Sequence, residues 1–146
     1  MGLLNFFAKI TRPWEVHLLK KDGSRESSGT QDRPGAIAGI ILGITDPALK
    51  IERVMYAGKP VSRTGFEDLV ADAHILNYFT EIAQKQGLPI ATLIERGLNK
   101  AQSKAAYVEV ARRTSKTLGV KEDQVFDLLM RRLSRGLAGI AKQQTP

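Results

Sequence analysis

The sequence contains no cysteine. This excludes disulfide scaffolds, thiolate zinc sites, iron–sulfur clusters and cysteine nucleophiles. Only two histidines occur, His17 and His74, which are too few and too far apart for most histidine-based metal sites. No apolar run reaches the roughly 18–20 residues that a membrane-spanning helix needs. The N-terminus also lacks the basic segment and cleavage pattern of a signal peptide. We therefore expect a cytoplasmic protein without a transmembrane segment.

No motif of an enzyme is present either. The segment 57–60 contains the Gly-Lys pair of a phosphate loop, but it lacks the upstream glycine and the following serine or threonine. No convincing order of serine, histidine and aspartate occurs. We expect a protein that is not an enzyme and that uses no small-molecule cofactor and no metal.

Positive charge is in excess and is unevenly distributed. The 146 residues include 22 lysines and arginines against 15 acidic residues, which gives a net charge of +7. The net charge is +4 over residues 1–63, −2 over 64–103 and +5 over 104–146. A basic excess of this kind is typical of nucleic-acid-binding proteins. The hydrophobic content of 42% is that of a globular chain.

The first part of the chain has short segments rich in glycine and proline. Alternation predicts strands over Trp14–Lys20 and Leu49–Tyr56, and Asp22-Gly23 is a hairpin-turn signal. The composition of Glu26–Gly35 predicts a loop. The apolar run Ala36–Ile44 fits a short buried helix or a core strand, and its periodicity does not decide between them.

The second part of the chain has the spacing of helices. Apolar residues from Phe66 to Ala83 recur at helical intervals, Gly87 ends that run, and Pro89 starts another. A further break is expected at Leu118-Gly119-Val120, before a last helix over about residues 122–141. The apolar residues of that last helix predicted to face inward are Val125, Phe126, Leu129, Leu133, Leu137 and Ile140.

These patterns predict an α+β protein, in which a small N-terminal α/β-hairpin region precedes a mostly α-helical C-terminal half. We divide the chain into three expected regions. Residues 1–58 form an accessory α+β region, 59–101 form a dimerisation and DNA-binding region, and 102–146 form a basic helical region.

The segments Ile75–Gly87 and Leu88–Lys100 resemble the two helices of the ribbon-helix-helix family of DNA-binding proteins, to which Arc repressor and MetJ belong. The resemblance covers about residues 59–101. It implies an intertwined homodimer whose β-ribbon, just before the first helix, lies in the major groove of double-stranded DNA. It also implies a phosphate contact at the start of the second helix, near Thr92.

The ribbon must be placed where its side chains suit DNA. At the usual spacing it would be Phe66–Ala71, whose carboxylates are poor partners for DNA. Lys59–Gly65 is the better candidate, with Ser62, Arg63 and Thr64 as base readers and a longer first helix. An ordinary helical hairpin remains the competing interpretation.

A second segment, residues 107–133, resembles the helix-turn-helix of phage repressors such as Cro. Ser115 is small where two helices would approach, Gly119 would make the turn, and Leu118, Val120 and Val125 would be apolar supports. Acidic residues near the start of its second helix would repel phosphates. A plain helical bundle is therefore the competing interpretation of this segment.

Our first hypothesis is a dimeric DNA-binding transcriptional regulator of bacterial, plasmid or phage type. The alternative is a non-catalytic adaptor or inhibitor whose basic surface binds an acidic protein. Weak membrane attachment through Leu3, Leu4, Phe6 and Phe7 ranks last. The residues expected to contact DNA are Lys59, Ser62, Arg63, Thr64, Thr92, Arg112, Arg113, Lys116, Lys121, Arg131, Arg132 and Arg135.

Overall fold

The computed structural model describes residues 11–146 and confirms the α+β class. The membrane-attachment hypothesis falls on residues outside this range. The chain divides into two compact units. Unit 1 comprises the chain up to Leu69 together with Gln143–Pro146, and unit 2 comprises Val70–Lys142. The boundary between the two units lies inside one long helix.

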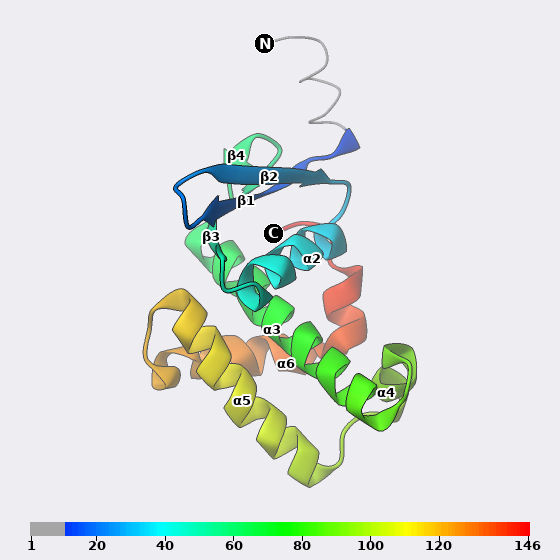
Figure 1. Ribbon diagram of the computed structural model, residues 1–146. Coiled ribbons are helices and arrows are strands. Elements are labelled where there is room, and N and C mark those ends of the chain that lie inside the picture. The colour runs from blue at the N-terminus through cyan, green and yellow to red at the C-terminus, as the bar shows by residue number, and fades with distance from the viewer. Residues whose placement is uncertain (1–10) are drawn as a thin grey trace. The chain divides into compact units, whose positions relative to one another are not determined.

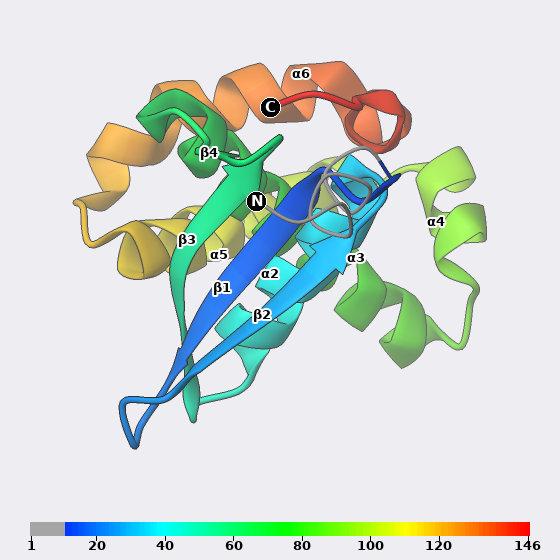
Figure 2. The ribbon, with the colours of Figure 1, turned by 90° about the horizontal axis from the view of Figure 1, so that it is seen from above.

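Unit 1 contains a four-stranded antiparallel sheet in the order β2-β1-β3-β4 (Figure 2). Its strands are β1 (Trp14–Lys20), β2 (Arg25–Thr30), β3 (Leu49–Tyr56) and β4 (Lys59–Pro60). The strands predicted for β1 and β3 are confirmed with the same bounds. Because successive side chains of β1 point to opposite faces, Trp14, Val16 and Leu18 are all buried on one of them.

Helix α2 (Arg33–Thr45) covers that buried face of the sheet (Figure 1). Three glycines four residues apart let it approach closely. A Cβ atom on Gly43 would lie 2.9 Å from both Ile51 Cγ1 and Leu18 Cδ2, and one on Gly39 would lie 3.2 Å from Val16 Cγ2. The segment Ala36–Ile44, which the sequence left open, is thus a helix, and its glycine face lies too close to the sheet for larger residues.

One prediction in unit 1 is wrong. The segment Glu26–Gly35 is not a loop, because β2 extends to Thr30 and α2 begins at Arg33. The backbone of β2 pairs with β1 in register, for example Ser27 with His17. Backbone groups alone make these ladder hydrogen bonds, so an edge strand forms here from residues whose side chains favour turns.

Unit 2 is helical. Its elements are α3 (Arg63–Gln86), which begins in unit 1, α4 (Ile90–Arg96), α5 (Lys100–Leu118), the 3-10 helix η1 (Glu122–Val125) and α6 (Phe126–Lys142). The predicted ends at Gly87 and Gly119 are confirmed, and both glycines have positive φ angles, 66° and 69°. Gly97, at φ 76°, ends α4 after only seven residues.

Helix α6 faces its unit differently from the prediction. Leu128 and Arg132 are buried although they were not predicted to face inward, and Leu129 is buried as predicted. Phe126 and Leu133, which were predicted to face inward, are 51% and 36% exposed. The cause is a buried ion pair between Arg132 and Asp72 of α3, which fixes this rotation of the helix. Val125 and Ile140 are buried as expected.

The part of the chain that the structure describes includes no helix long and apolar enough to cross a membrane.

Candidate nucleic-acid interface

Helix α5 has a well-defined start, end and buried side. The Asn99 side chain accepts a hydrogen bond from the Gln102 backbone N–H at 2.8 Å, and the Gln102 side chain accepts one from the Asn99 backbone N–H at 3.1 Å. This reciprocal capping box starts the helix, and Gly119 ends it in a left-handed conformation. The buried side of α5 carries Ala106, Val110, Ala111, Thr114 and Ser115.

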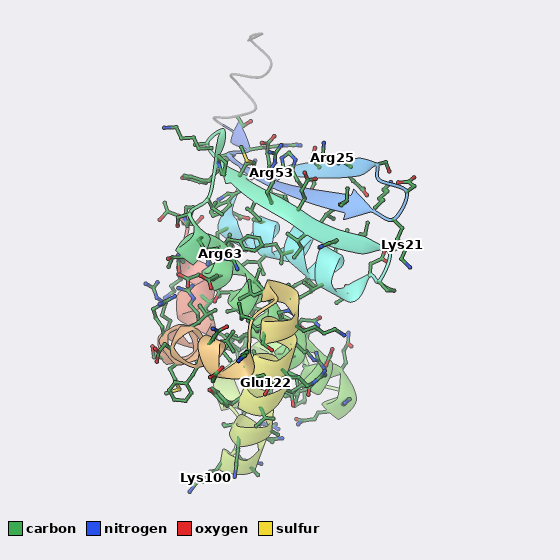
Figure 3. All side chains as sticks on the ribbon, turned by 90° about the vertical axis from the view of Figure 1, so that its left-hand side faces the viewer. Lys21, Arg25, Arg53, Arg63, Lys100 and Glu122 are labelled. Carbon is green, nitrogen blue, oxygen red and sulfur yellow. The ribbon has the colours of Figure 1, made fainter. Side chains whose placement is uncertain are left out.

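Exposed cations follow one another along α5 at four-residue steps, and the row winds gradually around the helix because each step advances it by about 40°. We call Lys100, Lys104, Arg112 and Lys116 the α5 basic row, and all four are exposed. Val108, which is exposed and uncharged, occupies the position between Lys104 and Arg112. From Lys100 to Lys116 the helix rises about 24 Å, the length of roughly seven base pairs of DNA. Figure 3 shows the Lys100 side chain extending from the beginning of the helix.

Most of this row is electrostatically available. No carboxylate within residues 11–146 forms an ion pair with Lys100, Lys104 or Lys116. Arg112 is the exception, because its guanidinium is hydrogen-bonded to Glu109. Lys121, just after the turn, is also exposed and has no carboxylate partner in the described chain. These lysines can pair with phosphates without breaking an existing ion pair.

Arg113 belongs to an internal network and not to the basic row. Its two Nη atoms donate to the Glu81 carboxylate at 2.9 and 3.0 Å, and its Nε donates to Glu109 at 2.9 Å. The guanidinium also lies 5.5 Å from the ring centroid of Tyr78. The hydrogen bonds from Arg112 and Arg113 lower the pKa of Glu109 to about 2. Because two carboxylates already hold Arg113, it is a poor phosphate ligand.

Beside this network, His74 of α3 is buried and neutral. Its Nε2 lies 2.7 Å from Thr117 Oγ1, and the Thr117 hydroxyl itself donates to the Arg113 carbonyl. The Thr117 oxygen therefore accepts from His74, which places the imidazole proton on Nε2. Burial, and then the charge of Arg113, lower the pKa of His74 to about 4.

The structure does not place Arg132 on the exposed surface where a DNA contact was expected. Its side chain is 1% exposed, and its Nε and Nη2 donate to the two oxygens of Asp72 at 2.8 and 2.7 Å. Asp72 is itself fully buried. A bidentate pair enclosed in this way holds α6 against α3 and leaves Arg132 no access to DNA. Its neighbours Arg131 and Arg135 are exposed.

The structure shows no continuous strand over Lys59–Gly65, where the ribbon was expected. Only Lys59 and Pro60 are in a strand, which pairs with β3 of the same chain, and α3 begins at Arg63. The Ser62 hydroxyl accepts a hydrogen bond from the Gly65 backbone N–H at 3.0 Å and so caps that helix. Exposed Lys59, Arg63 and Thr64 therefore lie in unit 1 but not on a ribbon, and Arg63 lies 3.9 Å from Glu67.

The predicted phosphate contact near Thr92 has little structural support. Thr92 lies half-buried in α4, whose seven residues are about half the length of the second helix that the resemblance implies. The N-cap residue of α4 is Pro89, which provides no side-chain hydrogen bond and no N–H of its own.

The segment 107–133 has the local form of a helix, a turn and a helix. Ser115 and Val125 are buried where α5 and η1 meet, and Gly119 makes the turn between them. Exposed Glu122 and Asp123 precede the second helix. Carboxylates at this position repel phosphates, so the side of this segment suited to DNA is α5 and not the start of α6.

The prediction missed Lys100 and Lys104 as candidate site residues. Their signal was in the sequence, since Lys100, Lys104, Arg112 and Lys116 are spaced by multiples of four residues. The outer face of the unit 1 sheet carries a second group of basic residues, Lys50, Arg53 and Arg25. Figure 3 labels Arg25 and Arg53 of this group. Arg25 of that group is paired with Glu52 at 2.9 Å.

Residues 11–146 contain no group of three or more histidine, aspartate or glutamate side chains that could hold a metal ion. Comparisons with protein-family models, with curated proteins and with solved structures find no match for this chain.

Proposed function

We propose that this chain is a DNA-binding protein of the type that regulates transcription, and that the α5 basic row contacts the phosphates of double-stranded DNA. The observation that carries the proposal is the succession of exposed cations along α5, of which Lys100, Lys104 and Lys116 have no carboxylate partner among residues 11–146. Charge in this arrangement neutralises phosphates and releases counterions.

The proposal differs from the initial hypothesis in its contact surface. Neither a ribbon nor Arg132 takes part, and the acidic start of α6 keeps that helix out of the groove. The homodimer was implied by the resemblance to the ribbon-helix-helix family, and the phosphate contacts proposed for α5 do not require it. Phosphate contacts fix position and supply affinity, and they carry little sequence information.

The number of contacts sets the expected salt dependence. If Lys100, Lys104, Lys116 and Lys121 each neutralise one phosphate, the logarithm of affinity falls with the logarithm of salt concentration with a slope of about −3.6. Between 50 and 200 mM salt, affinity would then decrease roughly 100-fold. Fluorescence anisotropy with a labelled 20-base-pair duplex measures this slope directly.

The decisive variant is Lys100→Gln/Lys104→Gln. Removing cations from the first turns of a helix does not weaken the helix, since the macrodipole disfavours positive charge there. We expect the salt slope to become less negative by about 2, one unit per lost contact.

The matched control, Lys21→Gln/Lys50→Gln, removes the same charge from exposed positions of unit 1. It should leave the slope unchanged within about half a unit. Equal losses in both double variants would refute a site on α5 and leave only the effect of net charge. No binding at 50 mM salt would refute the DNA proposal and favour an acidic protein as the partner.

A further inference from the structure

Unit 2 contains a cavity between α3, α5 and α6. Its volume is about 260 Å³. Ile75, Ala106 and Val110 form its floor, and all three are buried. Leu133 and Ser103 also line it and are exposed, so the cavity opens to solvent beside them.

The lining defines what the cavity can hold. No charged side chain lines it, and its side-chain polar groups are the hydroxyls of Ser103 and Tyr107. An ion entering this space would lose its hydration without gaining a partner of opposite charge. An uncharged molecule with a mainly apolar body would lose little and could form one hydrogen bond near the opening.

The volume limits the size of the occupant. Apolar cavities of about 150 Å³ stay dry and take up benzene, so 260 Å³ corresponds to about ten non-hydrogen atoms. A second cavity of about 90 Å³ shares Ile75, Phe79 and Leu133 with the first. Leu133 therefore contributes to the walls of both, and removing its side chain is expected to join them.

A second copy of this chain is a poorer occupant. The exposed large apolar side chains of α6 are those of Phe126, Met130 and Leu133, at 51%, 51% and 36% exposure, and Leu133 lines the cavity. Together they offer roughly 280 Å² of surface, given about 200 Å² for each large side chain. A stable interface needs about 800 Å² from each partner.

We propose that this cavity is a binding site for an uncharged, mainly apolar small molecule of about ten non-hydrogen atoms, such as a singly substituted aromatic ring. The site belongs to unit 2 alone, and its occupancy does not depend on whether the chain binds DNA.

The test uses the full-length protein with labelled methyl groups and n-butylbenzene as the probe, followed by NMR. We expect saturable shifts at the methyl groups of Ile75, Val110 and Leu133. The charged counterpart, 4-butylbenzoate, should bind at least about tenfold more weakly because its carboxylate loses hydration. The absence of saturable shifts up to the solubility limit of n-butylbenzene would overturn the proposal.

Matched variants separate the cavity from a general apolar surface. Ala106→Leu fills the cavity and should weaken binding about tenfold or more, whereas Ala105→Leu, on the exposed side of α5, should change it less than about twofold. Equal weakening by both would refute the site.

Two further measurements keep the test independent of how Ala106→Leu folds. Leu133→Ala joins the two cavities, so the longer probe hexylbenzene should bind this variant more tightly than the wild type. Hexylbenzene binding that is unchanged would contradict the assigned walls. Sedimentation that shows a dimer with the same methyl groups at its interface would assign the cavity to a second copy.

Discussion

The buried pair of Asp72 and Arg132 allows the sharpest test of how unit 2 is held together. Arg132→Met replaces the guanidinium by an apolar side chain and leaves the Asp72 carboxylate buried without its bidentate partner. The two side chains are 0% and 1% exposed. Removing one partner from such a pair costs about 3–5 kcal/mol, mostly because the remaining charge stays buried.

This cost can be converted to a melting temperature. The entropy of unfolding is about 2.1 cal/mol/K per residue, or about 0.3 kcal/mol/K for the whole chain, so 1 kcal/mol shifts Tm by about 3 °C. We expect Arg132→Met to lower Tm by roughly 10–15 °C if the chain unfolds in one step. Separate unfolding of unit 2, with half of the residues, would about double the shift.

Two further variants identify the cause. Asp72→Leu/Arg132→Met replaces the pair by apolar groups and should recover most of the loss, since such replacements are often neutral. Arg131→Met changes the exposed neighbour and should cost no more than about 1 kcal/mol. The assay is urea unfolding followed by circular dichroism at pH 7. The reasoning fails if Arg132→Met costs less than about 1 kcal/mol while weakening DNA binding, because Arg132 would then be a surface contact.

For three other perturbations, the structure determines whether stability should rise or fall. Alanine in place of a helical glycine normally stabilises a protein, but Gly43→Ala should lower Tm, because its Cβ would lie 2.9 Å from two side chains of the sheet. In the control Gly139→Ala the Cβ would meet only one atom, at 3.4 Å, so the same thermal scan should show no such loss. The pKa of His74 is about 4 in the folded protein against an ordinary 6.5, so the free energy of unfolding measured in urea should fall as pH decreases from about 6.5 to 4. If the free energy of unfolding of His74→Asn falls just as steeply over that pH range, this reasoning is wrong. Arg112 and Arg113 lower the pKa of Glu109 from 4.5 to about 2, so Glu109 contributes stability above pH 4.5 that is lost as pH falls towards 2. In the same urea titration, the free energy of unfolding of Glu109→Gln should therefore decrease less between pH 4.5 and 2.

The parts of the fold that the sequence predicted correctly depend on local signals. Alternation located β1 and β3 to the residue, and the glycines at 87 and 119 end helices because only a residue tolerant of positive φ fits there. The strand β2 was not predicted because its pairing with β1 depends on the partner backbone and not on its own side chains.

The candidate site was harder to predict, because charge alone does not reveal which cations are already paired. Arg113 is held by Glu81, which is 32 residues away, and Arg132 by Asp72, which is 60 residues away. Neither partner can be identified from spacing on one helix. Arg132 did carry a local hint, because it lies three and four residues after Leu129 and Leu128, on the apolar side of α6.

The net charge of +5 over residues 104–146 therefore overstates the charge that DNA could meet. Arg113 and Arg132 are neutralised internally, and Arg112 shares Glu109 with Arg113. What remains on α5 is a set of lysines, whose compact ammonium groups suit phosphate as point charges and not as bidentate base readers. A surface of this kind binds DNA through its backbone, so sequence preference, where the protein shows any, must come from side chains outside the α5 basic row.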